Sequence, residues 1–239
     1  MNIRRITAWA IGALIIAIAA VIGAFFFFNS DGKGKPKTEA CEVVFFRMGT
    51  FCSLSFYGTP LQNEQSIQIV EETLKEVELA CSLFASDSEL RKLNQTAALE
   101  PFVCSERLWS VLGAAREAWR NSGGAFDVTA KPLMDLWGFY RKRGADTPSD
   151  REIAETLLRI GLDKVRFDDQ AQSVFFTVPD MAIDLGGIAK GYAIDLAATR
   201  LSIAGISQGM INLGGNIRVL SEPPPGLTRY RVGVRDPRT

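Results

Sequence analysis

The spacing of apolar and polar residues predicts several amphipathic helices. Apolar residues recur at intervals of three and four from Ile67 to Cys81, which predicts a helix over residues 62–83. Two Ser-x-x-Glu segments, beginning at Ser86 and Ser149, have the form of capping boxes and predict helix starts. The expected helices cover residues 62–83, 86–93, 106–120 and 149–161, with a last one that ends near residue 203.

Segments rich in Val, Phe, Ile and Ser predict strands between these helices. Strands are expected within residues 43–57, 164–167, 173–178, 210–213, 217–220 and 230–234. The first of these turns around Arg47-Met-Gly-Thr50, and Gly214-Gly215 is expected to form a bulge. Helices and strands follow one another in a mixed order without an internal repeat. This order favours an α+β fold over a strictly alternating doubly wound sheet.

The N-terminal region reads as a membrane segment. Residues 6–28 carry no charge and follow Arg4 and Arg5. At about 1.5 Å per residue this stretch spans a hydrocarbon core of ~30 Å. A secretory signal peptide is the alternative, but no small-residue cleavage site follows cleanly. We therefore expect a membrane anchor or signal segment over residues 1–28, a polar linker over 29–40 and one domain over 41–239.

The composition excludes several classes of protein. No histidine is present, which excludes Ser-His-Asp and Cys-His hydrolases and His-ligated zinc sites. Lys+Arg and Asp+Glu number 27 each, so no basic excess points to nucleic acid. The cysteines (Cys41, Cys52, Cys81 and Cys104) lack CxxC spacing, and we expect buried free thiols rather than a metal site or disulfides. Chemistry must rest on carboxylates, Lys, hydroxyls, backbone groups and a hard cation such as Mg²⁺.

Residues 181–192 form the motif with the clearest chemistry. Their sequence predicts a short apolar strand, a Gly186-Gly187 turn and a helix that carries Lys190 near its start. Unpaired N–H groups at such a turn, together with the lysine, would suit a phosphate-bearing ligand. Asp184 is placed to meet a hydroxyl, a ring N–H or a metal. The alternative is that the glycines serve close packing and the lysine is solvated.

A second dense segment covers residues 124–139. Asp127 and Thr129 lie in a loop between a glycine stop and Pro132, where polar groups are presented to ligands. The simpler interpretation is that Asp127 caps the helix entered at Pro132. Further on, Asp195 and Thr199 form an Asp-x-x-x-Thr pattern, but a solvated helix face explains it better than a metal site.

Taken in order, six motifs resemble the FAD:protein FMN transferase (ApbE) family, over the chain from about residue 43 to its end. They are Arg47–Thr50, the segments 82–94 and 124–139, Ile183–Tyr192, Ile211–Gly215 and Val232–Pro237. The resemblance implies an α+β architecture similar to the tunnelling fold. It also implies Mg²⁺-dependent transfer of FMN from FAD to a threonine or serine of an acceptor protein, with release of AMP.

The resemblance further implies a set of site residues. The positions that match flavin contacts are Met48, Phe84, Ala125, Phe126, Asp127, Asp184 and Lys190. Lys190 and Asp184 are the expected catalytic residues, and Gly187 is expected to offer its backbone carbonyl to the metal. Phe84 replaces a tyrosine usual in the family, so stacking is kept and a hydroxyl is lost. Side-chain metal ligands are expected beyond Thr239, so the sequence is interpreted as a fragment or a truncated form.

The expected location follows from charge and resemblance together. Arg4 and Arg5 favour an N-terminus inside the cell, although Lys33, Lys35 and Lys37 reduce the asymmetry. Family members commonly act outside the cytoplasmic membrane on respiratory redox subunits, which supports a single-pass anchor with an extracytoplasmic domain. Two other functions stay open: a non-catalytic FAD-binding protein, and a pyrophosphatase that hydrolyses FAD to FMN and AMP.

Overall fold

The computed structural model describes residues 38–140, 147–234, 236 and 238. The predicted anchor over 1–28 and most of the linker lie outside the described residues. The chain divides into two units, Met1–Glu39 and Ala40–Thr239, and the fold below is that of the second. Within the part that is described, no helix combines the length and apolar character needed to cross a membrane.

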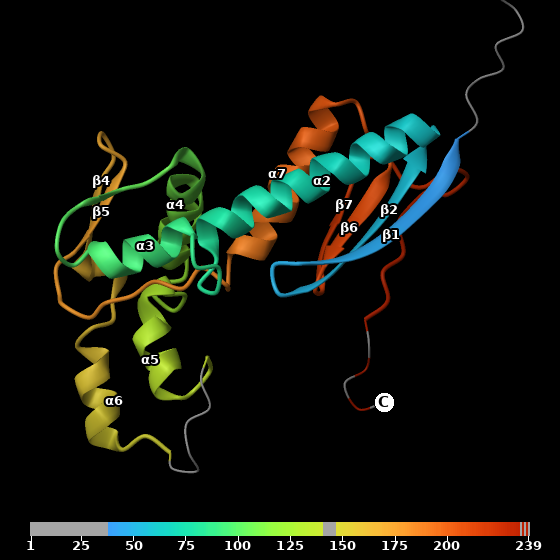
Figure 1. Ribbon diagram of the computed structural model, residues 1–239. Coiled ribbons are helices and arrows are strands. Elements are labelled where there is room, and N and C mark those ends of the chain that lie inside the picture. The colour runs from blue at the N-terminus through green and yellow to red at the C-terminus, as the bar shows by residue number, and fades with distance from the viewer. Residues whose placement is uncertain (1–37, 141–146, 235, 237, 239) are drawn as a thin grey trace, which may run out of the picture. The chain divides into compact units, whose positions relative to one another are not determined.

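A four-stranded sheet with the order β1-β2-β6-β7 forms one part of the fold (Figure 1). Its strands are β1 (Glu39–Arg47), β2 (Thr50–Gly58), β6 (Gly209–Leu213) and β7 (Asn216–Val219). The first and last pairs are hairpins, and β2 pairs antiparallel with β6 although more than 150 residues separate them. Alternate residues of β2, among them Leu54 and Phe56, are fully buried. This alternation gives the sheet one apolar face.

Two long helices, α2 (Pro60–Cys81) and α7 (Ala189–Ile203), bury that face. Figure 1 shows α2 in cyan along β2, with α7 in orange beside it. Val70, Leu74 and Val77 on α2 are fully buried. Small residues on α7, including Ala193 and Ala197, are buried as well, so the two helix backbones approach closely. Thr59 and Gln62 form a capping box at the start of α2.

The remaining elements are four shorter helices, two 3₁₀ turns and a small sheet. The helices are α3 (Glu89–Thr96), α4 (Glu106–Asn121), α5 (Lys131–Leu136) and α6 (Asp150–Leu157), with 3₁₀ turns η1 (Val128–Ala130) and η2 (Leu162–Lys164). The sheet has the order β3-β5-β4, from β3 (Phe102–Val103), β5 (Ser173–Phe176) and β4 (Val165–Asp168). Its strands pair antiparallel.

The structure confirms most of the predicted elements and corrects several. The structure confirms the first predicted helix, the helix over 106–120 and the Ser149 capping box. It also confirms the hairpins β1–β2 and β4–β5. The cap of α3 is Ser88 rather than Ser86, because the Ser88 hydroxyl accepts the Arg91 N–H. Gly214-Gly215 is a two-residue hairpin turn with φ of 57° and 91° rather than a bulge. Residues 230–234 form no strand, since no neighbouring strand pairs with them among the described residues.

A charged cluster joins the two long helices to α4. Glu76 on α2 accepts hydrogen bonds from Arg107 Nε at 2.8 Å and from Arg200 on α7 at 2.7 Å. Arg107 also donates to the Tyr192 hydroxyl at 2.9 Å, and Arg200 to the Thr73 hydroxyl at 3.0 Å. Burial alone would raise the pKa of Glu76, but the bonds from the two arginines outweigh it and lower that pKa. The cluster therefore stabilises the folded state when Glu76 is ionised.

Replacing this carboxylate gives a pH-dependent test of the helix junction. Glu76→Gln is expected to lower the free energy of unfolding by about 1–2 kcal/mol at neutral pH, a modest value because the pair is partly exposed and screened. Because the folded-state pKa is lowered, this contribution is complete above the ordinary value of 4.5 and is lost as the pH falls through the folded-state value.

Urea denaturation of both proteins between pH 7 and pH 3 measures the difference. Glu64→Gln, at an exposed position of the same helix, is the matched control and should behave like the unmodified protein. A difference that stays constant over this pH range would contradict the account.

Candidate functional site

One pocket of about 520 Å³ brings together four of the predicted site residues. It lies among the β1–β2 turn, the end of α2 with the loop behind it, and the start of α7. The predicted residues in its wall are Met48, Phe84, Asp184 and Lys190. The others that line it are Phe46, Gly49, Glu78, Cys81, Ser82, Leu83, Ala85, Gly186 and Ala189.

The β1–β2 turn places Met48 in an uncommon backbone conformation. Met48 and Gly49 have φ of 50° and 74°, as a two-residue hairpin turn of the primed type requires. Such a φ is costly for a residue with a side chain. The Met48 N–H donates to Glu78 Oε1 at 3.1 Å, so α2 holds the turn in place. The result is that the Met48 side chain stands at the edge of the pocket.

The segment that carries Asp184 is extended but belongs to no sheet. Asn94 on α3 replaces a strand partner: its Nδ2 donates to the Ile183 carbonyl at 2.8 Å and its Oδ1 accepts the Ile183 N–H at 2.8 Å. The Asp184 N–H donates to the Val128 carbonyl at 2.8 Å. Residues 181, 183 and 185 are buried while 182 and 184 are half-buried. The strand predicted for this segment is therefore wrong, because a side chain supplies the bonds of a ladder.

Asp184 is oriented by two donors. Its Oδ1 accepts the Gly186 N–H at 2.7 Å, and its Oδ2 accepts the hydroxyl of Tyr140. Burial and the bond to Asp184 raise the pKa of Tyr140, so the phenol stays protonated and keeps donating throughout the neutral range. The carboxylate at the pocket wall thus has a fixed direction and retains lone pairs for a ligand.

More backbone N–H groups of the turn before α7 are hydrogen-bonded than its sequence predicts. The N–H of Ile188 donates to the Leu185 carbonyl at 3.0 Å and that of Ala189 to the same carbonyl at 2.8 Å. With the Gly186 N–H on Asp184, the prediction of unpaired N–H groups is wrong for these three residues. A Cβ on Gly187 would lie 3.2 Å from the ring of Phe126, so this glycine serves close packing.

Lys190 is held by one long hydrogen bond. Its Nζ donates to the Gly186 carbonyl at 3.3 Å, and within the described residues it pairs with no carboxylate. A bond of this length to a neutral acceptor is readily exchanged for one to an anion. The ammonium group is therefore available to a negatively charged ligand in the pocket.

Phe84 presents a free aromatic face. The residue is 77% exposed although it lines the pocket. The Ser82 hydroxyl accepts the N–H groups of Phe84 and Ala85, each at 3.1 Å, which orders the loop behind α2. The centre of the Phe84 ring lies 6.1 Å from that of the Tyr140 ring, and the two planes are tilted by 58°. A planar ligand in this pocket would find a stacking surface here.

Ala125, Phe126 and Asp127 do not line this pocket. Asp127 is the N-cap of η1: its Oδ1 accepts the Thr129 N–H at 2.8 Å and the Thr129 hydroxyl at 2.6 Å. Its Oδ2 accepts the Leu162 N–H at 3.1 Å. The capping interpretation is thus confirmed, for the 3₁₀ turn that leads into α5. Phe126 lies against Gly187, the remaining predicted residue, which does not line this pocket either.

The cysteines are free thiols, as expected, and three of them are buried. Burial raises the pKa of Cys52 to about 11 and those of Cys81 and Cys104 to about 12. Cys81 lines the pocket, yet it carries a proton at neutral pH and is a poor nucleophile.

Three residues of the site were missed by the sequence analysis. Tyr140 binds Asp184, 44 residues away, and Glu78 binds the N–H of Met48, 30 residues away. Asn94 binds the backbone of Ile183, 89 residues away. Helical periodicity places Glu78 on a helix, and Asn94 directly follows the helix predicted over 86–93. Nothing in a single sequence shows which distant backbone group a polar side chain binds.

Comparisons with known proteins identify relatives of the whole described domain. The model of the ApbE family matches residues 48–239. The chain is 28% identical over 228 residues to the FAD:protein FMN transferase of Escherichia coli K12, covering 92% of this chain and 65% of that protein. It is 31% identical over 196 residues to the FAD:protein FMN transferase of Vibrio cholerae, covering 80% of this chain and 57% of that protein.

Solved structures agree with these relatives. The flavin transferase ApbE from Vibrio cholerae superposes with a TM-score of 0.76 at 28% identity, covering 84% of this chain and 65% of that one. The ApbE protein from Thermotoga maritima gives a TM-score of 0.75 at 30% identity, with coverages of 84% and 65%. The predicted α+β fold is confirmed. The chain spans less than two thirds of the length of these relatives.

The Asn94 contact gives a test of how the site is held. Asn94→Ala is expected to lower the free energy of unfolding by about 1–3 kcal/mol, because the Ile183 N–H and carbonyl lose their partners in a buried setting. Hydrogen exchange at the amides of 183 and 184 should accelerate more than exchange in α2. Gln95→Ala, at an exposed position of the same helix, is the control. Equal acceleration across the whole domain would argue against a local role.

Proposed function

This chain belongs to the ApbE family, and we propose that it transfers FMN from FAD to a threonine or serine hydroxyl of an acceptor protein, with release of AMP. The observation that carries the proposal is the pocket itself. Two segments far apart in the sequence bring an aromatic face, an oriented carboxylate and an available ammonium group to one place. These are the groups that a ring system joined to a pyrophosphate requires.

The reaction needs positioning and charge neutralisation more than a strong base. The acceptor oxygen forms a bond to the phosphorus of the FMN half, and the bond from that phosphorus to the bridging oxygen breaks. AMP leaves with the electron pair, and the hydroxyl proton passes to solvent or to a nearby acceptor. We propose that Lys190 neutralises the charge that develops on the phosphate oxygens. The absence of histidine from the sequence is compatible with this chemistry.

The other residues bind and orient the flavin nucleotide in this proposal. Phe84 stacks on a ring system, Met48 contacts it from the β1–β2 turn, and Asp184 accepts a hydrogen bond from the ligand. Ala125, Phe126 and Asp127 belong to the site as the layer behind the Gly186-Gly187 turn. Phe126 supports Gly187, and Asp127 fixes the loop from which Phe126 projects.

Mg²⁺ enters the proposal through the family resemblance. In this chain Gly187 would contribute its carbonyl oxygen. The described residues contain no group of three or more His, Cys, Asp or Glu side chains arranged to hold a metal ion. Since Mg²⁺ prefers about six oxygen ligands, the described residues do not fit a complete site. We therefore assign no step of the reaction to the ion.

We also propose a membrane location for the activity. The uncharged segment 6–28 supports a single-pass anchor, and the resemblance supports a domain on the extracytoplasmic side that acts on redox proteins. Protease treatment of intact spheroplasts would test this orientation, since an outward-facing domain should be digested without permeabilisation.

Mass spectrometry tests the proposed reaction directly. The full chain in detergent, FAD and Mg²⁺ are incubated with the membrane proteins of the source cells, and covalent flavin is detected by fluorescence on a denaturing gel and by peptide mass. An FMN adduct on a threonine or serine is expected, together with AMP. Lys190→Ala should reduce the rate by at least about a hundredfold, because a charge is lost at the reacting phosphate. Lys75→Ala, at an exposed position of α2, is the matched control.

The alternatives give different products in the same assay. Free FMN and AMP without an adduct would identify a pyrophosphatase. Saturable FAD binding without AMP would identify a binding protein.

A further inference from the structure

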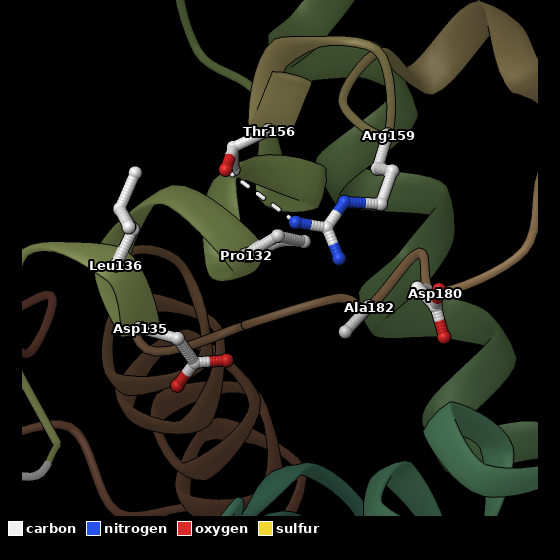
Figure 2. A pocket seen from close by; sticks show the side chains of 7 residues that line it. All are labelled: Pro132, Asp135, Leu136, Thr156, Arg159, Asp180 and Ala182. Atoms are coloured by element: carbon white, nitrogen blue, oxygen red, sulfur yellow. Dashed lines mark hydrogen bonds between the residues drawn. The ribbon is translucent and has the colours of Figure 1, made fainter. Parts of the chain in front are cut away.

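A second pocket, of about 500 Å³, lies beside the first along the segment that carries Asp184. Three parts of the chain form it: α5, α6 with the residues that follow it, and residues 180–182. Figure 2 shows its lining residues: Pro132, Asp135, Leu136, Thr156, Arg159, Asp180 and Ala182. The guanidinium group of Arg159 projects into its middle, between Pro132 and Ala182 (Figure 2).

Arg159 is unusual among the half-buried cations of the described residues. Five others pair with a carboxylate: Arg47, Arg107, Arg116, Lys131 and Arg200. A sixth, Lys164, donates to the carbonyls of residues 157, 158 and 160. Arg159 has one long hydrogen bond, from Nη2 to the Thr156 hydroxyl at 3.4 Å, and no carboxylate among the described residues. Only Lys190, in the first pocket, resembles it in this respect.

The nearby groups do not satisfy this guanidinium. Asp135 pairs with Lys131 at 2.6 Å, so its charge is already compensated. Asp180, the other carboxylate of the lining, forms no ion pair with Arg159, and its side chain points away from the guanidinium (Figure 2). Lys164 donates to the carbonyl of Leu157 at the end of α6 and to two carbonyls that follow it, so Arg159 is not needed to cap that helix. A guanidinium that is half-buried and unpaired favours a carboxylate or phosphate ligand.

The lining excludes one obvious ligand. None of the seven lining residues is aromatic, so the pocket lacks a stacking surface for a flavin or an adenine ring. A polypeptide with an acidic side chain fits it better. The two pockets are lined by neighbouring residues of one stretch of chain: Ala182 lines this pocket, and Asp184 and Gly186 line the first. Four residues of extended chain span roughly 13 Å.

We propose that this pocket, the acceptor pocket, binds an acidic side chain of the acceptor protein through Arg159. The acceptor would lie extended along residues 180–186, with the carboxylate about four residues from the hydroxyl that receives FMN. Arg159 is then a specificity contact, which chooses the acceptor without touching the reacting atoms. The inference rests on the proposed transferase function, because it takes the first pocket as the flavin site.

Synthetic peptides test this proposal. Each is a fluorescein-labelled 15-residue peptide of alanine and glycine with one central threonine and a single Asp, Asn or Lys four residues before or after it. Binding to the FAD-loaded full chain in detergent is measured by fluorescence polarisation, and transfer by intact mass. The Asp peptide of one orientation should bind about tenfold more tightly than its Asn counterpart. The Lys peptide should bind least.

Variants assign the preference to Arg159. Arg159→Gln should abolish the preference for Asp over Asn while FAD binding, measured by flavin fluorescence, is unchanged. Arg159→Lys should keep part of it. Arg151→Gln, which removes an exposed cation from α6, the helix that precedes Arg159, is the matched control and should leave the preference intact.

The outcomes separate this proposal from the proposed function. Equal binding of Asp and Asn peptides, or an equal loss for both in Arg159→Gln, overturns the acceptor pocket. Transfer of FMN to all peptides at equal rates overturns it as well but upholds the transferase. Selective binding of the Asp peptide through Arg159 without any FMN adduct upholds the pocket and overturns the transferase.

Discussion

The pair of hydrogen bonds between the Asn94 side chain and the backbone of Ile183 fixes the segment on which both pockets depend. Without a neighbouring strand, residues 181–185 would have no regular partners for their peptide groups. Asn94 and Val128 supply those partners, and the burial of Ile183 keeps the segment extended. Because side chains alternate along an extended chain, the residues on either side of Ile183 face outward together. Ala182 and Asp184 thereby enter adjoining pockets.

The long helix α2 performs the same task for the other wall. Its buried residues pack on β2 and α7, while Glu78 at its end receives the Met48 N–H. Glu76, two residues earlier, binds the arginines of α4 and α7. One helix therefore sets both the position of the β1–β2 turn and the angle at which α7 presents Lys190. A disturbance of the Glu76 cluster should reach the pocket through this helix rather than through a direct contact.

The parts of the fold that could be predicted from sequence are those specified by local patterns. The three- and four-residue spacing in α2 and the Ser149–Glu152 capping box lie within single elements, and both were predicted correctly. The segment containing Ile183 is apolar and precedes a Gly-Gly turn, which predicted a short strand. Its burial does alternate as in a strand, but the partner is a side chain 89 residues away, which no local pattern reveals.

The candidate site shows the same division. Met48, Phe84, Asp184 and Lys190 were predicted by their resemblance to family motifs, and the structure brings them to one pocket. Asp127 was predicted from the same motifs, but all its described bonds are internal. Tyr140 was missed because its role exists only when the end of the α5 segment folds back on Asp184.

The distribution of cations separates the scaffold of this domain from its ligand sites. Arg107 and Arg200 share Glu76, and a ligand phosphate could recruit either one only by breaking bonds that join three helices. Lys190 and Arg159 do not join helices in this way, since the side chain of each has one long hydrogen bond to a neutral oxygen among the described residues. Replacing that hydrogen bond with an ion pair to a ligand stabilises the complex and breaks no contact between helices. A chain with equal numbers of acidic and basic residues can therefore still present two positive sites, provided that acidic side chains such as Glu76 pair with the cations that join its helices.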